Sequence, residues 1–373
     1  MEQVPDKRFY ALDVFRGATV FLMIVVNTPG GGAVPYRQLL HAKWNGCTLA
    51  DLVFPSFLFA VGSALPWVLA KFGGNNRIAL LHIVKRAVLI FIVGWLLGWY
   101  TTLHWEGWAL HFTPIRHVRI MGVLQRIALC YAAAGILALY VRPKRITVIA
   151  MSLPVAYWLL LSGLGVPGAQ YSLHGNAVRQ IDIALFGVNH MYSEAGLSFD
   201  PEGLLSTIPA ITNVLAGYLM SVFIRHRGIA NRTLLILLLT GVASIASGWL
   251  WGFALPLNKK LWTSSYVMFT AGIDLVVMTG LICIVDIYRW RKSTTFLAAV
   301  GKNPLFIYVL SNLLLIILIL PIRGDYTMDW VNRLIFQAWI PGPFGSLMFA
   351  ICFTLPLALI AWWMDKKRIY LRL

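Results

Sequence analysis

The residues best suited to chemistry stand together in one short hydrophilic stretch, residues 41–51, with the sequence HAKWNGCTLAD. His41 carries an imidazole, which can accept a proton near neutral pH. Asp51 carries a carboxylate, and Asn45 and Thr48 add polar groups between them. This combination predicts general-base chemistry at His41, with a solvated loop histidine as the alternative interpretation.

Asp51 also has a structural interpretation. It follows Thr48 at the spacing of a capping box, in which two side chains bond each other's backbone at the start of a helix. A carboxylate there also suits the positive end of the helix dipole. The two roles are compatible, because a capped carboxylate has a fixed direction and can orient a neighbouring histidine.

A line of polar side chains follows the first apolar stretch. Asp13, Arg16, Val20, Met23 and Asn27 recur at spacings of three and four, so they share one face of a helix. The first and last of them would be about 21 Å apart along the helix axis. We expect this face either to pack against other helices or to line a tunnel.

Further polar groups lie at the ends or in the middle of other apolar stretches. Gln125 and Arg126 begin one stretch, and Asp274 lies near the middle of another. An ionisable group at such depth indicates a functional site or a structural ion pair. Lys302 and Asn303 stand near the start of a later stretch, where an ammonium group suits a phosphate.

The bulk composition predicts an all-α polytopic membrane protein. The chain has 373 residues, of which 59% are hydrophobic and 12% are charged, whereas soluble domains carry about 25% charged residues. Its apolar stretches are about 20 residues long, the length of a membrane-spanning helix. We expect a single domain, residues 1–373, with about ten spans at 10–28, 48–70, 80–100, 120–141, 145–163, 203–224, 231–252, 263–287, 298–320 and 344–364.

The basic residues predict the orientation of these spans. Of 31 Lys and Arg residues, 19 lie in one set of alternate gaps and 9 in the other. By the positive-inside rule the first set is cytoplasmic, which puts both termini in the cytoplasm. The net charge of +17 then reflects topology, so we expect no nucleic-acid partner. Residues 325–343 are amphipathic and predict an interfacial or re-entrant segment.

Several classes of site have no motif in the chain. The four cysteines and the histidines show no metal-ligand spacing, so we expect no metal. No nucleophile elbow, phosphate-binding loop or dinucleotide fingerprint occurs. A secondary transporter of a sugar or an anion is the alternative class of function. Transporters often show inverted repeats and broken helices at matching positions, and the sequence indicates neither.

Several longer motifs resemble one family. They are LDVFRG (12–17) followed by Val26 and Asn27, HAKWNG (41–46), TLADLVFP (48–55), GVLQR (122–126), FDPEG (199–203), LNKKLWTSSY (257–266) and GKNP (301–304). Together they resemble the heparan-α-glucosaminide N-acetyltransferase family, and in particular its shorter bacterial members. The resemblance extends over nearly the whole chain.

The resemblance implies transmembrane acetylation in a bacterial inner membrane. Acetyl-CoA would bind on the cytoplasmic side, and its acetyl group would pass to the amine of a glucosamine-type sugar on the periplasmic side. The family's essential histidine falls on His41, and its asparagine and aspartate motif positions fall on Asn27 and Asp51. The resemblance also implies a homodimer.

The layout of polar residues suggests how such an enzyme would work. His41 would accept a proton from the acceptor amine, Asp51 would orient the imidazole, and Asn27 or Asn258 would stabilise the oxyanion. Coenzyme A would meet Arg16, Lys302 and Asn303. The side chains expected to contact the acceptor are Trp44, Asn45, Gln125, Arg126, Asn258 and Asp274.

Three alternatives remain open from the sequence. An acetyl-histidine intermediate would replace direct transfer. An O-acetyltransferase acting on an envelope polysaccharide would share the donor but form an ester. Trp44 belongs either to the acceptor site or to the aromatic belt at the membrane surface.

Overall fold

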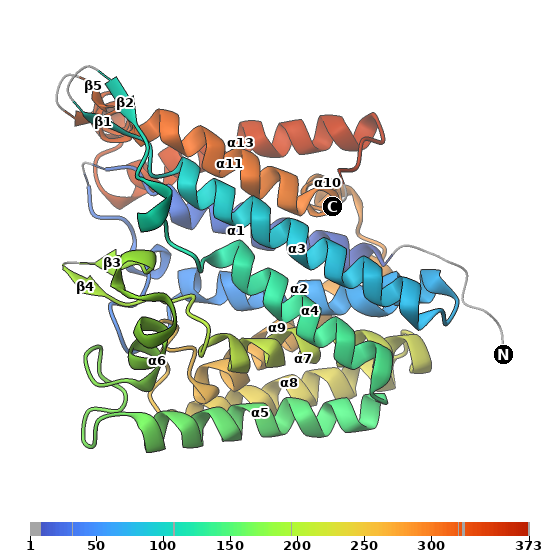
Figure 1. Cartoon of the computed structure of the whole chain (residues 1–373). Helices are drawn as coiled ribbons and strands as arrows, with labels where there is room; N and C mark the ends of the chain where they lie inside the picture. The colour runs from blue at the N-terminus through green and yellow to red at the C-terminus, as the bar shows by residue number, and fades with distance from the viewer. Residues whose placement is uncertain are drawn as a thin grey trace.

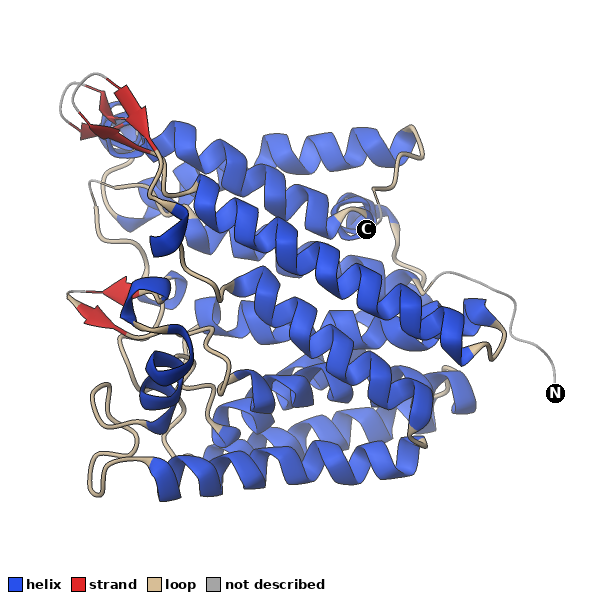
Figure 2. Cartoon of the chain, in the orientation of Figure 1, coloured by secondary structure: helices blue, strands red, loops and turns tan. Residues whose placement is uncertain are grey.

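A computed structural model describes residues 9–31, 33–106, 109–194, 196–319, 321–322 and 325–371 (Figure 1). Most of the regular structure is helical, with short strands confined to hairpins (Figure 2). The α helices are α1 (Tyr10–Asn27), α2 (Leu49–Leu69), α3 (Asn76–Tyr100), α4 (Val123–Tyr140), α5 (Pro143–Leu164), α6 (Ala177–Phe186), α7 (Thr207–Arg227), α8 (Asn231–Trp251), α9 (Ser264–Ile282), α10 (Thr295–Lys302), α11 (Pro304–Ile319), α12 (Thr327–Val331) and α13 (Pro343–Lys366).

The strands form three antiparallel hairpins. They pair β1 (His104–Glu106) with β2 (Ala109–His111), β3 (Ser193–Glu194) with β4 (Leu197–Ser198), and β5 (Pro321–Ile322) with β6 (Asp325–Tyr326). All three hairpins and α6 lie at one end of the helical bundle, on the left of Figure 1. This hairpin end is formed by the longer loops of the chain.

The helices confirm the predicted fold class. Within the described ranges, nine helices are long and apolar enough to cross a membrane, and a bent helix pair makes up to ten. The ends of most predicted spans agree with these helices to within a few residues. The agreement follows from the length of the apolar stretches, because each must cover the hydrocarbon core as a helix.

The ninth predicted span, 298–320, is broken rather than continuous. Residues Lys292–Lys302 and Pro304–Ile316 form two helices that meet at an angle of 75°. The break falls at Asn303, directly before Pro304. A proline lacks the backbone N–H and disfavours helical conformation in the residue before it, which ends α10 at this point.

Helix α10 packs closely against α1. A methyl group on Gly17 would overlap the carbonyl oxygen of Leu297, and one on Gly301 would overlap the carbonyl oxygen of Asp13. Both glycines are therefore needed for this close helix contact. Small residues serve the same purpose at many helix crossings in membranes.

Helix α2, which carries Asp51, is held in the same way by α7. A methyl on Gly62 would overlap the carbonyl oxygen of Val214, and one on Gly217 would overlap that of Phe59. In α1 and α7 the most apolar window is 67% buried, whereas in α3, α5 and α8 it is 28% buried. The corresponding window of α2 is 61% buried, so Asp51 stands on a central helix. The outer helices expose apolar side chains as lipid-facing helices do.

Within the stretch 325–343, residues 327–337 form a short helical segment. Helix α12 continues through a π-helical turn, η7 (Asn332–Gln337), before α13 begins. Asn332 is buried, while Leu334, Ile335 and Trp339 are exposed. The segment is too short to cross a membrane as a helix. This length is consistent with the predicted interfacial or re-entrant element.

Candidate active site

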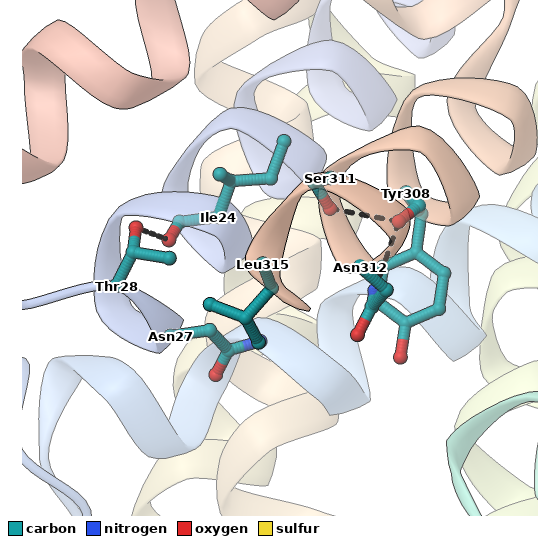
Figure 3. A pocket seen from close by; sticks show the side chains of 7 residues that line it. All are labelled: Ile24, Asn27, Thr28, Tyr308, Ser311, Asn312 and Leu315. Atoms are coloured by element: carbon teal, nitrogen blue, oxygen red, sulfur yellow. Dashed lines mark hydrogen bonds between the residues drawn. The ribbon is translucent and has the colours of Figure 1, made fainter. Parts of the chain in front are cut away.

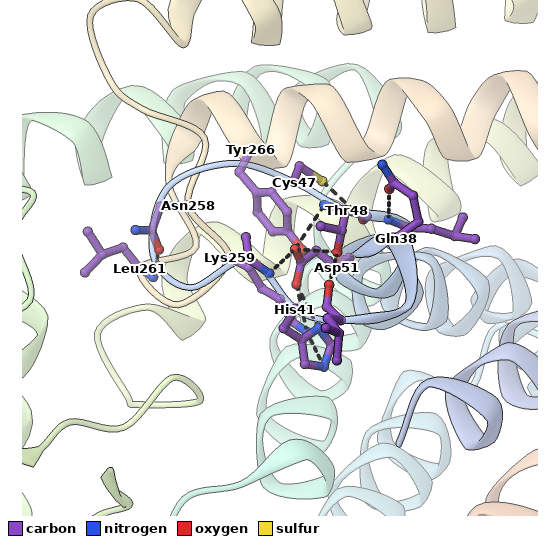
Figure 4. A network of polar contacts seen from close by, with 12 residues as sticks. Gln38, His41, Cys47, Thr48, Asp51, Asn258, Lys259, Leu261 and Tyr266 are labelled. Carbon is purple, nitrogen blue, oxygen red and sulfur yellow. Dashed lines mark hydrogen bonds and ion pairs between the residues drawn. The ribbon is translucent and has the colours of Figure 1, made fainter. Parts of the chain in front are cut away.

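The first turn of α2 fixes the Asp51 carboxylate. Its Oδ2 accepts hydrogen bonds from the backbone N–H of Thr48 at 3.0 Å, the Thr48 hydroxyl at 3.0 Å and the Ala42 N–H at 3.1 Å. These bonds include the predicted capping box, which is confirmed. The side chain is 1% exposed. Asp51 is therefore locked in one direction, with its other oxygen, Oδ1, turned toward the loop that precedes α2 (Figure 4).

The structure brings His41 onto that oxygen. Its Nδ1 lies 2.8 Å from Asp51 Oδ1, and its side chain is 45% exposed. A carboxylate can only accept, so Nδ1 carries the hydrogen of this bond and Nε2 keeps its lone pair. In this tautomer Nδ1 is held by Asp51, and the lone pair of Nε2 can accept a proton from a bound nucleophile.

Lys259 completes this cluster and was missed by the sequence analysis as a site residue. Its Nζ lies 3.0 Å from His41 Nδ1, 3.4 Å from His41 Nε2 and 3.5 Å from Asp51 Oδ1. Burial lowers the pKa of the Lys259 ammonium, and the charges of Asp51 and Glu202 oppose that shift. Its presence in the LNKKLWTSSY motif was the one signal for it in the sequence.

A backbone contact carries Lys259 to the site. Gly46 forms a parallel bridge with Asn258, and the Gly46 N–H donates to the carbonyl oxygen of Leu257 at 2.7 Å. Asn258 adds a side-chain bond from its Nδ2 to Asn45 Oδ1 at 3.2 Å and accepts from the Leu261 N–H at 2.8 Å. The loop between α8 and α9 is thereby fastened to the loop that carries His41. The Asn258 Nδ2 has a second hydrogen besides the one that it gives to Asn45, so the oxyanion role of Asn258 stays a prediction.

Two neighbours of the cluster are held without direct contact to the imidazole. The Trp44 indole donates to the carbonyl oxygen of Tyr171 at 2.8 Å and meets the Phe199 ring edge-on at 5.5 Å. Burial raises the pKa of the Cys47 thiol to about 12, and the Asp51 charge adds to the shift. Cys47 is therefore protonated at neutral pH and unsuited to act as a nucleophile.

A second polar cluster adjoins the first. Arg119 bonds Asp200 through two nitrogens at 2.8 and 2.6 Å, and bonds Glu202 at 2.5 Å. Burial alone would lower the pKa of Arg119, but its bonds to Asp200 and the charge of Glu202 raise it above the usual value. The Glu202 charge also acts on Lys259. Sequence reasoning noticed the FDPEG motif but did not connect it to Arg119.

Arg126 is buried beside this second cluster. Its guanidinium bonds the Gly203 carbonyl oxygen at 3.1 Å and the Ser206 hydroxyl, and it lies over the Trp262 ring at 4.8 Å. Gln125 is also buried, and it packs against glycines of α3 and of the turn before α4. Arg126 thus reaches the ring of Trp262, which follows Lys259 in the same loop, while the described contacts of Gln125 lie among helices.

Two other expected site residues lie apart from His41. Asp274 is 1% exposed, and its Oδ1 lies 2.5 Å from the Ser56 hydroxyl within the bundle. Asn27 faces α11, where it lines a cavity of about 20 Å³ with Tyr308 and Asn312 (Figure 3). Such a cavity has room for about one water molecule. The described contacts place neither residue against the imidazole.

The expected donor residues lie on α1 and at the α10–α11 break. Arg16 Nη1 is 3.7 Å from Asp13 Oδ1. Lys302 Nζ bonds both oxygens of Asp365 at 2.7 Å. Asn303 is fully buried, where it donates to the Ile369 carbonyl oxygen at 3.0 Å and accepts from the Leu371 N–H at 2.9 Å. Lys302 and Asn303 are therefore engaged with α13 and the residues that follow it, whereas the ion pair of Arg16 lies within α1.

Among the described residues, no group of three His, Cys, Asp or Glu side chains stands close enough to hold a metal ion. The reacting groups that the geometry does assemble are a base, its carboxylate and an ammonium group. Such a set can take up and release a proton beside a bound nucleophile.

Comparisons with known proteins agree with the motifs. Residues 8–149 match a family described as a domain of unknown function, DUF5009. The chain is 27% identical to the human heparan-alpha-glucosaminide N-acetyltransferase over 364 residues and to the mouse protein over 373 residues. Each alignment covers 81% of this chain, and the chain spans about half the length of these relatives, 52% and 53%. The comparisons thus confirm the resemblance to the heparan-α-glucosaminide N-acetyltransferases that the motifs predicted.

Proposed function

We propose that the protein is a transmembrane acetyltransferase. It takes the acetyl group of cytosolic acetyl-CoA and passes it to the amine of a glucosamine-type sugar on the periplasmic side of a bacterial inner membrane. The observation that carries the proposal is the contact between His41 and the carboxylate of Asp51, which three further hydrogen bonds hold in place. The similarity to acetyltransferases supplies the acyl donor.

The arrangement supports direct transfer with His41 as the base. The acceptor nitrogen attacks the thioester carbonyl carbon, and Nε2 takes the proton that the nitrogen loses. The C–N bond forms as the C–S bond breaks, and the coenzyme A sulfur receives the proton from the imidazolium. Asp51 holds the ring in the tautomer that this step needs and stabilises the imidazolium, as the orienting carboxylate does in Ser-His-Asp enzymes.

The two ends of the bundle suit the two substrates. His41, Lys259 and the Arg119 cluster come from loops at the hairpin end, which we assign to the acceptor side. Arg16 and Lys302 are the cations that we assign to the phosphates of coenzyme A. The bias of Lys and Arg toward one set of gaps supports a cytoplasmic donor side and cytoplasmic termini. A homodimer belongs to the proposal through the family resemblance.

The test is acetyl transfer by the purified full-length chain. Acetyl-CoA labelled in the acetyl group is incubated with a panel of amino sugars, and the products are identified by mass spectrometry. We expect an N-acetyl product from wild type and none from His41→Ala. His174→Ala is the matched control, because His174 is an exposed loop histidine outside the cluster. An ester product instead of an amide would identify an O-acetyltransferase.

The same labelled donor separates direct transfer from an acetyl-histidine intermediate. Wild type is mixed with acetyl-CoA alone, without acceptor, and digested. Direct transfer predicts no label on the peptide that contains His41. Label that stays on this peptide in wild type, and disappears in His41→Ala, would establish the covalent route.

One observation favours a secondary transporter as the second candidate. The 75° break between α10 and α11 is a feature that transporters use to bind substrates. Counterflow of a labelled amino sugar in proteoliposomes without acetyl-CoA would support the transporter. Product formation that requires acetyl-CoA and His41 would support the acetyltransferase.

A further inference from the structure

Lys259 and His41 share one carboxylate. Lys259 Nζ lies 3.5 Å from Asp51 Oδ1, the oxygen that also bonds His41 Nδ1 at 2.8 Å. The ammonium also lies 3.0 Å from Nδ1 itself. An ammonium group has no acceptor atom, and Nδ1 already gives its hydrogen to Asp51, so the short contact between these two nitrogens is not a hydrogen bond of its own.

This contact matters for the charge of the ring. A carboxylate beside a histidine favours the imidazolium, which cannot act as a base. A cation at hydrogen-bond distance from the ring disfavours it. Asp51 and Lys259 therefore act in opposite directions on the proton that Nε2 would hold.

We infer that Lys259 is a positioning residue whose positive charge opposes the charge of Asp51 at the His41 ring, so that His41 keeps its orienting hydrogen bond while the preference of Asp51 for the imidazolium is offset. The part of this inference that concerns catalysis rests on the proposed role of His41 as a base. The part that concerns charge does not, since it follows from the three side chains alone.

The other groups around Lys259 do not replace it. Glu202 acts on the ammonium, but Arg119 holds that carboxylate at 2.5 Å. Cys47 is a protonated thiol. Tyr266, on α9, donates its hydroxyl hydrogen to the Asp51 carbonyl oxygen at 2.5 Å rather than to the carboxylate. The ammonium of Lys259 is thus the cation that the described contacts place against both the ring and Asp51.

The test uses a reagent that modifies only neutral imidazole. Diethyl pyrocarbonate is added to the purified chain in a series of buffers, and modification of the peptide that contains His41 is measured by mass spectrometry. In Lys259→Gln, which keeps a hydrogen-bond donor but loses the charge, we expect the pH of half-maximal reaction to rise by about half a unit or more. Lys259→Arg keeps the charge and should match wild type.

The same experiment includes an internal standard and two results that would overturn the inference. Reaction of exposed His174 serves as the internal standard and should have the same pH dependence in all three proteins. A Lys259→Gln variant whose His41 curve coincides with that of wild type would overturn the inference. If Lys259→Gln fails to fold, Lys259→Met is used, and a rise in Lys259→Arg as large as in the uncharged variant would also overturn it.

The pH dependence of acetyl transfer provides a second measurement of the role of Lys259. If wild type transfers acetyl, the acid side of its pH profile for kcat/KM should move to higher pH in Lys259→Gln, whereas a merely structural role would lower the rate equally at every pH. If wild type transfers no acetyl to any acceptor, the proposed function fails. The modification curves then still decide whether Lys259 controls the charge of the ring.

Discussion

The Oδ2 atom of Asp51 accepts the N–H of Thr48 at 3.0 Å while Oδ1 faces the His41 ring at 2.8 Å, so one carboxylate starts a helix and holds an imidazole. Each oxygen has its own task. This division means that the structural and the chemical contributions of Asp51 can be separated by experiment.

The first prediction compares Asp51→Asn with Thr48→Ala. The asparagine keeps the shape but offers one oxygen instead of two and loses the charge that fixes the tautomer, so we expect kcat to fall on the order of 10²–10⁴-fold. Thr48→Ala removes the cap hydroxyl, which lies near both Asp51 Oδ2 and the Leu40 carbonyl oxygen, but keeps the charge of Asp51 and its backbone bonds. We expect it to cost roughly 1 kcal/mol of stability and to lower kcat far less than Asp51→Asn does. Thermal unfolding and initial rates measure both. Equal losses of rate in the two variants would mean that capping is the only task of Asp51.

The second prediction concerns the donor end. If Lys302 binds a phosphate, Lys302→Met should raise KM for acetyl-CoA about tenfold with kcat nearly unchanged, as expected for one charge-assisted bond. Asp365→Asn removes the carboxylate that competes for the same ammonium at 2.7 Å and should lower KM. Lys292→Met, at an exposed position of the same helix pair, is the control and should leave KM unchanged. A Lys302→Met variant with normal KM and a lower Tm would show a purely structural ion pair.

The third prediction is a pH dependence of stability from Asp182. Burial raises the pKa of this carboxyl to about 6, although its Oδ1 accepts from the Leu204 N–H at 3.0 Å. A raised pKa in the folded state stabilises the protein below the unfolded value near 4, and the contribution is lost as pH rises through about 6. At most about 3 kcal/mol is involved, since one pKa unit is 1.36 kcal/mol. The Tm of wild type should therefore fall between pH 4 and 6.5 relative to that of Asp182→Asn. Parallel Tm curves for the two proteins would contradict this.

The fourth prediction concerns Arg119. Its removal in Arg119→Met leaves Asp200, which is 1% exposed, without its two charged bonds. Breaking a buried pair from one side costs roughly 3–5 kcal/mol, so we expect a large loss in Tm. The double variant Arg119→Met with Asp200→Asn removes the stranded charge and should recover part of the loss. A double variant less stable than the sum of the two single changes would argue that the carboxylate has another essential partner.

The sequence predicted the spans well because one physical quantity sets them, the length of apolar chain needed to cross the hydrocarbon core. It also predicted the cap at Thr48 and the pairing of Asp51 with His41, since all three residues lie close in sequence. Local spacing carries this kind of information. The break at Asn303 was missed, although Pro304 was a visible reason to expect one.

The sequence pattern did not predict contacts between segments that are far apart in the chain. Lys259 reaches His41 through a bridge between Gly46 and Asn258, and no periodicity in either loop specifies that bridge. Arg119 meets Asp200 for similar reasons, through loops from different parts of the bundle. Asn27 is on the helix that was predicted, but it lines a small cavity with residues of α11, and the described contacts do not place it against the imidazole.

The side-chain amide of Asn303 makes two hydrogen bonds that give residues near the C-terminal end a structural role. Residues 369–371 stabilise the break between α10 and α11, because both hydrogen bonds of this fully buried side chain are made to their backbone. A chain shortened before Ile369 would leave the buried Asn303 amide without these two hydrogen-bond partners and would destabilise the junction of α10 and α11.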